Sequence, residues 1–258
     1  VFPFFFFFVG NAMAFVMPKL EEKNIFWQKI IKRTFLIFII CLLLNWFPFI
    51  KYDDAGHLVA KPFANLRIMG VLQRIALSYF FASVIIFYFK IKGAFVFSSF
   101  LLLAYWFLCV AANPADPYSI NGWFGTAIDK KILGTAHLYK GEGIPFDPEG
   151  LPGTVAAIAQ VIFGYIAGHY IITKGKTAEM VNGLFVAGCV LVFAGFCWDT
   201  VFPLNKKIWT SSYTVYTSGL ALLILALLIY LVEFKDQRGG WTKFFDVFGK
   251  NPLFIFVL

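Results

Sequence analysis

The sequence has few charged residues, only 14% of its 258 positions, whereas 60% are hydrophobic and 20% are aromatic. A disordered chain or a charged coiled coil needs the opposite balance. A soluble globular domain of this length has too little interior to bury so many apolar side chains. The shortage of charge therefore indicates that lipid surrounds most of this chain.

Cysteine and histidine are also scarce. The four cysteines lie in apolar stretches without C-x-x-C spacing, which excludes a disulfide scaffold and suggests small packing residues (Cys41, Cys109, Cys189 and Cys197). His137 and His169 stand alone, without the spacing of metal ligands. No G-x-x-x-x-G-K, G-x-S-x-G or H-E-x-x-H motif occurs. We therefore expect no metal site and none of the common soluble-enzyme motifs.

Positive charge is in excess, with a net charge of +8. A nucleic-acid-binding protein gathers its Lys and Arg on one folded polar face. Here these residues stand in short clusters between apolar runs. The pattern predicts a lipid bilayer as the partner and no nucleic acid.

Apolar runs of span length repeat along the chain. About 20 residues of helix cross a hydrocarbon core of about 30 Å, and an open sheet would leave its backbone without hydrogen bonds in lipid. The sequence therefore predicts an all-α, polytopic transmembrane helical bundle with about eight spans. The runs are 1–17, 34–50, 68–89, 94–112, 151–172, 180–199, 211–233 and 247–258.

The two ends of the sequence lie inside apolar runs. Val1 is neither an initiator Met nor the start of a signal peptide, and Leu258 falls within a run that begins near Val247. We interpret residues 1–258 as a single transmembrane domain that is incomplete at both ends.

The connecting segments differ in positive charge. Segments 18–33, 90–93, 173–179 and 234–246 hold 12 Lys and Arg, while the longer segments 51–67, 113–150 and 200–210 hold 8. Because short cytoplasmic loops carry the excess of Lys and Arg, the first group is predicted to be cytoplasmic and the second extracytoplasmic. The long outer loop 113–150 is long enough to have a function of its own.

Arg74 stands inside a predicted span, next to Gln73. A charged group in a span needs a partner or a cavity. Arg74 is predicted to face a central cavity and anchor a carboxylate or a ligand, although an arginine that extends to the membrane interface is the alternative.

The segment Phe146–Gly150 reads F-D-P-E-G and directly precedes a predicted span. A carboxylate at a helix N-terminus is stabilised by free N–H groups and the helix dipole, so Asp147 is either a helix cap or a functional carboxylate. Glu149 is predicted to orient a catalytic base or to accept a proton.

A third cluster, residues 205–213, leads from the outer side into the next span. Asn205, Lys206 and Trp209 combine an amide, a cation and an indole, which suits a sugar ligand. An interfacial belt of Trp, Tyr and Lys explains the same residues.

The order of these motifs resembles the heparan-alpha-glucosaminide N-acetyltransferase family and its bacterial relatives, over nearly the whole sequence. The motifs that carry the resemblance are Val1–Phe4 with Gly10, Arg67–Ile75, Asp129 with Leu133–Gly134 and His137–Tyr139, Phe146–Thr154, Gly164–Gly168, Asn205 to Tyr213, and Gly249 with Asn251–Pro252.

The resemblance implies a transmembrane acetyltransferase that takes acetyl-CoA from the cytoplasmic side and acetylates the amino group of a glucosamine-type sugar or glycan end on the other side. The family's catalytic histidine precedes the V-F-P motif, so this sequence lacks it, and whether the chain is active alone stays open. His137 matches a different family histidine, in the long loop, and is expected to bind substrate.

The same resemblance, together with chemistry, suggests roles for the candidates. Amine acetylation needs a base and an oxyanion donor, and acetyl-CoA phosphates need cations. The expected catalytic residues are Glu149, Arg74 and Asp147, the expected substrate-binding residues are Asn205, Lys206, Trp209 and His137, and the expected acetyl-CoA-binding residues are Arg33 and Lys32.

Two other functions fit the sequence. Polar residues within predicted spans, such as Asn11, Gln73 and Gln160, also suit a transporter of amino sugars or acylated sugars. A membrane scaffold subunit leaves Arg74 unexplained. The localisation expected from the bacterial relatives is the inner membrane, while the acceptor sugar and the oligomeric state, including a homodimer, stay open.

Overall fold

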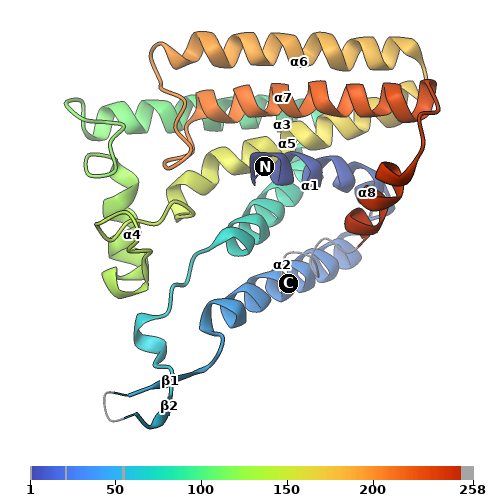
Figure 1. Ribbon diagram of the computed structural model, residues 1–258. Coiled ribbons are helices and arrows are strands. Elements are labelled where there is room, and N and C mark those ends of the chain that lie inside the picture. The colour runs from blue at the N-terminus through green and yellow to red at the C-terminus, as the bar shows by residue number, and fades with distance from the viewer. Residues whose placement is uncertain (1, 21, 54–55, 251–258) are drawn as a thin grey trace.

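The computed structural model describes residues 2–20, 22–53 and 56–250, and it is mainly helical (Figure 1). Five helices are long and apolar enough to cross a membrane, namely Phe2–Lys19, Val71–Ala112, Leu151–Lys174, Ala178–Asp199 and Ser211–Phe234. The elements are α1 (Phe2–Val16), η1 (Met17–Lys19), α2 (Lys23–Trp46), β1 (Ile50–Tyr52), β2 (Leu58–Ala60), η2 (Phe63–Asn65), α3 (Val71–Ala112), α4 (Phe124–Leu133), η3 (Thr135–His137), α5 (Leu151–Lys174), α6 (Ala178–Asp199), α7 (Ser211–Ile229), the π-helical turn η4 (Tyr230–Phe234) and α8 (Gly240–Lys250).

The helical membrane fold is confirmed, but a count of eight spans is not. Runs 68–89 and 94–112 fall within α3, which counts as one of the five candidates although it is interrupted at Lys90. Run 34–50 corresponds to α2, which begins earlier, so that every span-length stretch of it contains Lys29, Lys32 and Arg33. Run 247–258 lies mostly outside the described residues, as does the Asn251–Pro252 motif.

Helix α3 is interrupted at Lys90, whose φ of 55° and ψ of −169° are not helical. The Arg74 guanidinium lies 4.4 Å from the centre of the Trp209 ring, and Tyr105 donates a 2.6 Å hydrogen bond to the carbonyl of Ile208. In a straight helix Arg74 and Tyr105 would be about 45 Å apart. Because the two side chains reach the adjacent residues Trp209 and Ile208, the halves of α3 form a hairpin that turns at Lys90, where the sequence predicted a connection.

Helix α5 is the central helix, and α1 packs along it with almost no space between the two backbones. A Cβ atom on Gly10 would lie 1.8 Å from the carbonyl oxygen of Val161, and one on Gly164 would lie 1.9 Å from that of Phe7. Small residues permit such close contact between membrane helices. Glycine at these two positions therefore determines how near α1 lies to the centre of the bundle.

Helices α6 and α7 run side by side and form the layer above α3 and α5 in Figure 1. Gly195 and Gly219 lie at their contact, where a Cβ would come within 2.6 Å of the facing backbone. The outer surface of α6 is apolar and exposed, with Phe193 at 70% and Val186 at 64%. Such an apolar surface is suited to lipid, not to water.

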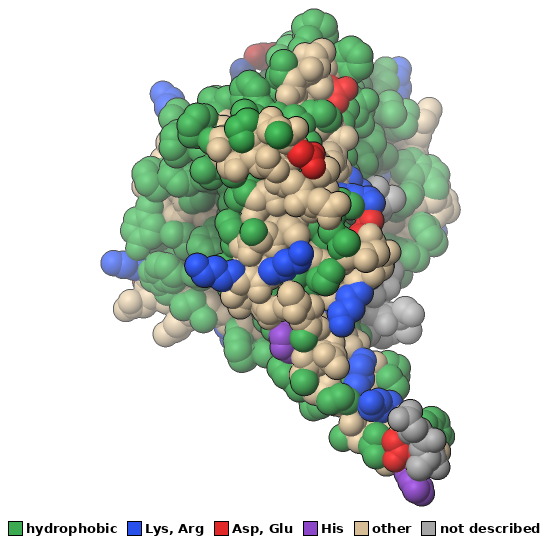
Figure 2. Space-filling view, turned by 90° about the vertical axis from the view of Figure 1, so that its left-hand side faces the viewer, with side chains coloured by type: hydrophobic (Ala, Val, Ile, Leu, Met, Phe, Trp, Pro, Cys, Tyr) green, Lys and Arg blue, Asp and Glu red, His purple; other side chains and the backbone are tan. Residues whose placement is uncertain are grey.

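The segments that the sequence assigned to the outer side lie together at one end of the bundle. Arg67 binds Asp147, and Lys207 forms an ion pair with Glu142, so these contacts join 51–67, 113–150 and 200–210. The two-stranded hairpin β1–β2 projects from this end. Figure 2 views the same end and shows basic side chains distributed across it and down towards the hairpin.

Candidate active site

The first turns of α3, α5 and α7 meet at this end, and ionisable side chains are buried or half-buried between them. Segment 113–150, which contains α4, packs against the start of α5. The ionisable residues are Arg67, Arg74, Asp129, Asp147 and Glu149, and together we call them the charge cluster. Charged groups in such a place need partners, because burial removes their hydration.

Arg67 connects the start of α3 to the F-D-P-E-G segment. Its Nε donates to Asp147 Oδ2 at 2.9 Å, and its Nη2 donates to Asp147 Oδ1 at 2.6 Å and to Glu149 Oε2 at 2.5 Å. Burial lowers the pKa of Arg67, but the hydrogen bonds and charges of the two carboxylates outweigh burial and leave that pKa raised. Arg67 is therefore a charged, bidentate clamp on these acids.

Arg74 is fully buried, and its pairing is incomplete. Its Nη1 donates to the carbonyl of Pro148 at 2.9 Å, and its guanidinium lies over the Trp209 ring. Gly153 leaves room for it, since a Cβ there would lie 2.4 Å from Arg74 Nη2. Nε and Nη2 of Arg74 have no hydrogen-bond partner among the described residues. The buried Nε and Nη2 of Arg74 can thus donate hydrogen bonds to a ligand oxygen.

Asp129, on α4, is almost completely buried. Its Oδ1 accepts the N–H of Leu151, the first residue of α5, at 3.0 Å, while its Oδ2 has no hydrogen-bond partner among the described residues. Burial raises the pKa of Asp129 from 3.8 to about 7, with a smaller upward effect from Asp147, and the Leu151 N–H and Arg74 act in the opposite direction. Asp129 is thus a buried acid that titrates near neutral pH.

The arrangement differs from the expected one in two respects. Asp147 does not cap α5, because its Oδ1 accepts the N–H of Glu149 and Asp129 accepts the first N–H of the helix instead. The carboxylates at 147 and 149 are bound by Arg67, and not by Arg74 as the sequence suggested. Arg67 and Asp129 stand in the motifs behind the family resemblance, yet neither was predicted as a site residue.

Trp209 forms the floor beneath Arg74. Its indole makes edge contacts with Phe2, Phe6 and Tyr213, at ring-centre distances of 5.3 to 5.4 Å. Its backbone φ of 55° is rare for a residue other than glycine and stores local strain. Trp209 is thus a buried residue that packs against Arg74, and not part of an exposed aromatic belt.

The other predicted substrate-binding residues lie at the margin of the cluster. The Nδ1 of His137 is 2.6 Å from the carbonyl of Leu66, next to Arg67. Asn205 joins its loop to segment 113–150 through a bond from Nδ2 to the carbonyl of Tyr118, and its Oδ1 accepts the N–H of Lys207 within the loop. Lys206 is exposed. The structure therefore brings Trp209 into the cluster and leaves Lys206 on the surface.

Lys32 and Arg33 line a separate cavity of about 340 Å³ with Lys29 and Tyr79. The Arg33 guanidinium lies 5.8 Å from the centre of the Tyr79 ring. Tyr79 is on the same half of α3 as Arg74, five residues further along, which is a rise of about 7.5 Å. Along α3, the cationic cavity therefore lies close to the charge cluster.

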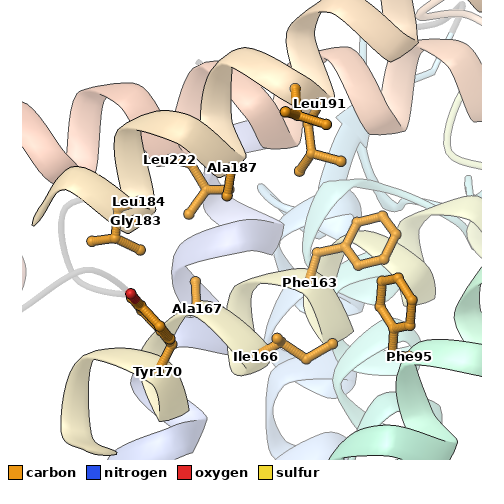
Figure 3. Close-up of a pocket in the computed structure, with 11 residues that line it drawn as sticks. Phe95, Phe163, Ile166, Ala167, Tyr170, Gly183, Leu184, Ala187, Leu191 and Leu222 are labelled. Carbon is orange, nitrogen blue, oxygen red and sulfur yellow. The ribbon is translucent and has the colours of Figure 1, made fainter. Parts of the chain in front are cut away.

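A second cavity, of about 380 Å³, lies between α3, α5, α6 and α7 (Figure 3). Phe163, Ile166, Leu184 and Leu191 are among its walls, and the Tyr170 hydroxyl lies at one edge. None of its lining residues belongs to the charge cluster. The site is therefore located by its buried charges, and not by this apolar cavity.

In a comparison with known proteins, no family model matches the chain. The heparan-alpha-glucosaminide N-acetyltransferase of Mus musculus is 24% identical over 322 aligned positions, which cover 100% of this chain and 46% of the mouse protein. The Homo sapiens protein of the same name is 28% identical over 145 positions, 50% of this chain and 22% of its own length. The chain thus spans less than half the length of these relatives.

These matches confirm the family resemblance: the chain is a distant relative of heparan-alpha-glucosaminide N-acetyltransferase. Both relatives are named N-acetyltransferases, which supports acyl transfer at the level of the family.

Proposed function

We propose that the protein carrying this chain moves an acetyl group from acetyl-CoA to the amino group of a glucosamine-type sugar. The donor enters from the cytoplasmic side and the acceptor from the opposite side. The names of the two relatives support the reaction class, and the five apolar helices support catalysis within a membrane. The charge cluster is the observation that carries the proposal, because a membrane protein buries ionisable groups chiefly where they function.

The chemistry of the reaction fits these residues. The amine nitrogen attacks the thioester carbonyl, the carbon–sulfur bond breaks, CoA leaves as the thiol, and the nitrogen loses one proton. The oxyanion of the tetrahedral intermediate needs hydrogen-bond donors, and the proton needs an acceptor. The unpaired N–H groups of Arg74 are suited to the first task, and the carboxylates of Glu149 and Asp129 to the second.

The remaining residues of the cluster position these groups. Arg67 fixes Asp147 and Glu149 through three hydrogen bonds, and Trp209 holds the guanidinium of Arg74 from the opposite side. In the proposed site the charge cluster supports the catalytic histidine that the family resemblance implies, and it binds the acceptor.

On the donor side, Lys29, Lys32 and Arg33 provide three cations in one cavity. The phosphates of acetyl-CoA require cations of this kind, and Arg33 can bind two phosphate oxygens at once. Because Tyr79 and Arg74 are two helical turns or less apart on α3, a thioester arm that begins at Arg33 leads towards the charge cluster.

The test measures transfer of labelled acetyl from acetyl-CoA to glucosamine in membranes that contain the protein. Glu149→Gln and Arg74→Ala are expected to lower the rate more than about tenfold, since each removes a group that acts on the developing charges. Lys131→Gln, on the exposed surface of α4, is the matched control and should retain the rate.

Two results would contradict the proposal. Normal turnover in both variants would defeat the residue roles. Uptake of the sugar into vesicles without acetyl-CoA, and no acetylated product with it, would identify a transporter instead.

A further inference from the structure

Helix α8 (Gly240–Lys250) separates its apolar and polar side chains onto opposite faces. Successive residues are about 100° apart around a helix, so residues three and four apart share a face. The apolar face consists of Trp241, Phe244, Phe245, Val247 and Phe248, and the polar face of Thr242, Lys243, Asp246, Gly249 and Lys250. Lys250 and Asp246 form an ion pair of 2.6 Å along the polar face.

The apolar face is not covered by the described part of the chain. No residue of α8 is buried, and the exposed fractions are 63% for Phe245, 58% for Val247 and 54% for Phe244. An isolated helix of this length is only marginally stable in water. Its large aromatic face therefore needs an apolar surface to lie on.

The position of α8 in the chain indicates which surface this is. The last candidate span ends at Phe234, and residues 235–239 connect it to α8. Five residues reach at most about 18 Å, so α8 begins near the point where the span leaves the membrane. In Figure 1 it follows directly from the right-hand end of α7.

The charges and aromatic residues of α8 match a membrane surface. Lys235 and Arg238 precede the helix, and Lys243 and Lys250 lie on its polar face. Trp and Phe prefer the boundary between headgroups and acyl chains, and basic residues are attracted to anionic headgroups.

We propose that α8 lies in the plane of the membrane surface, with its aromatic face among the acyl chains and its lysines at anionic phospholipid headgroups. This binding surface is independent of the acetyl-transfer site and does not rest on the proposed function.

The experiment places a nitroxide label on either face of α8 in the full chain, in a background without the four native cysteines. The chain is reconstituted into vesicles of phosphatidylcholine with phosphatidylglycerol. Phe245→Cys reports the apolar face and the adjacent Asp246→Cys reports the polar one, and both residues are exposed, so neither change removes a core contact. Phe244→Cys repeats the measurement on the apolar face.

At positions 244 and 245 we expect the ratio of oxygen collisions to collisions with a water-soluble nickel complex to exceed that at 246 by about tenfold, as for a helix half immersed in acyl chains. Equal exposure of both faces to the nickel complex would overturn the proposal. So would labels at 244 and 245 that neither reagent reaches, because the face would then pack against protein.

The preference of α8 for anionic lipid is tested by comparing vesicles with and without phosphatidylglycerol. Replacing phosphatidylglycerol by phosphatidylcholine should reduce the collision ratio at 245, and the double variant Lys243→Gln/Lys250→Gln should reduce this dependence on lipid charge. An unchanged ratio in uncharged vesicles would refute the role of the lysines.

Discussion

Arg67 and Arg74 stand close in sequence, but their surroundings give them different tasks. The side chain of Arg67 is 28% exposed and bound by two carboxylates, whereas Arg74 is fully buried and bound by one carbonyl and one indole ring. Burying a cation costs several kcal/mol unless it is well paired. The Nε and Nη2 donors of Arg67 are therefore engaged by the protein, whereas Nε and Nη2 of Arg74 keep hydrogen-bonding capacity for another molecule.

The acid–base behaviour of Asp129 makes the stability of the protein depend on pH. Because its pKa is raised to about 7, the folded protein holds a proton that the unfolded chain releases near pH 4. The free energy of unfolding therefore falls as the pH rises from about 4 to about 7. For this group the loss of stability is about 4 kcal/mol, and it does not increase further above pH 7. The variant Asp129→Asn keeps a side-chain oxygen that can accept the N–H of Leu151, but it removes the ionisable carboxyl group.

In detergent, the melting temperature of the wild type should decrease relative to that of Asp129→Asn between pH 5 and pH 8. The exposed Glu22→Gln is the control and should follow the wild type at each pH. A constant difference between wild type and Asp129→Asn across this range would show that Asp129 does not titrate there.

The proposed role of Arg33 can be tested through the KM for acetyl-CoA. Arg33→Gln should raise the KM for acetyl-CoA roughly tenfold with a smaller change in kcat, because in the proposed donor site it removes a bidentate phosphate contact that is made both before and during the reaction. Initial rates at varied acetyl-CoA check this. Lys23→Gln, on the same helix but outside the cavity, is the control, and an unchanged KM in Arg33→Gln would exclude Arg33 from the donor site.

Among the elements, the close contact of α1 and α5 has the clearest consequence for stability. The glycines at 10 and 164 face backbone carbonyls, which cannot rotate away as a side chain does. An added methyl group must therefore separate the helices, and with them Phe2 and Phe6 from Trp209.

Gly164→Ala should lower the free energy of unfolding by about 1–3 kcal/mol, the usual cost of overpacking. Thermal unfolding followed by circular dichroism measures the change. Gly240→Ala is the matched control, since no atom lies within 4 Å of its added Cβ. Equal melting temperatures for the two variants would mean that α1 is not held against α5.

For the whole molecule, the two sets of connecting segments make the membrane orientation testable. With a membrane-impermeant thiol reagent on intact cells, Lys131→Cys should be labelled and Lys92→Cys should be labelled only after lysis, because the excess of basic residues places the second segment inside. Both positions are exposed, and the background lacks native cysteines. The reverse pattern would invert the predicted orientation.

The sequence predicts those features of the architecture that depend on neighbouring residues, and not those that depend on residues far apart in the chain. Apolar runs identify α1, α5, α6 and α7 because hydrophobicity is a local property of the chain. The bond from Arg67 to Asp147 spans 80 residues, and no local pattern shows which arginine takes the carboxylates. Local sequence also does not show that Asp129, and not Asp147, accepts the first N–H of α5, because Asp129 belongs to a different helix, α4.

The Arg67 clamp has a consequence for any negatively charged molecule that reaches this end of the bundle. Such a molecule meets a guanidinium whose Nε and Nη2 donors are already engaged by Asp147 and Glu149. It can take these donors only by exchange, in which the newcomer binds the arginine and the two acids lose this partner together. At Arg67, an incoming anion therefore releases negative charge next to itself, and neutral or cationic molecules enter without that competition.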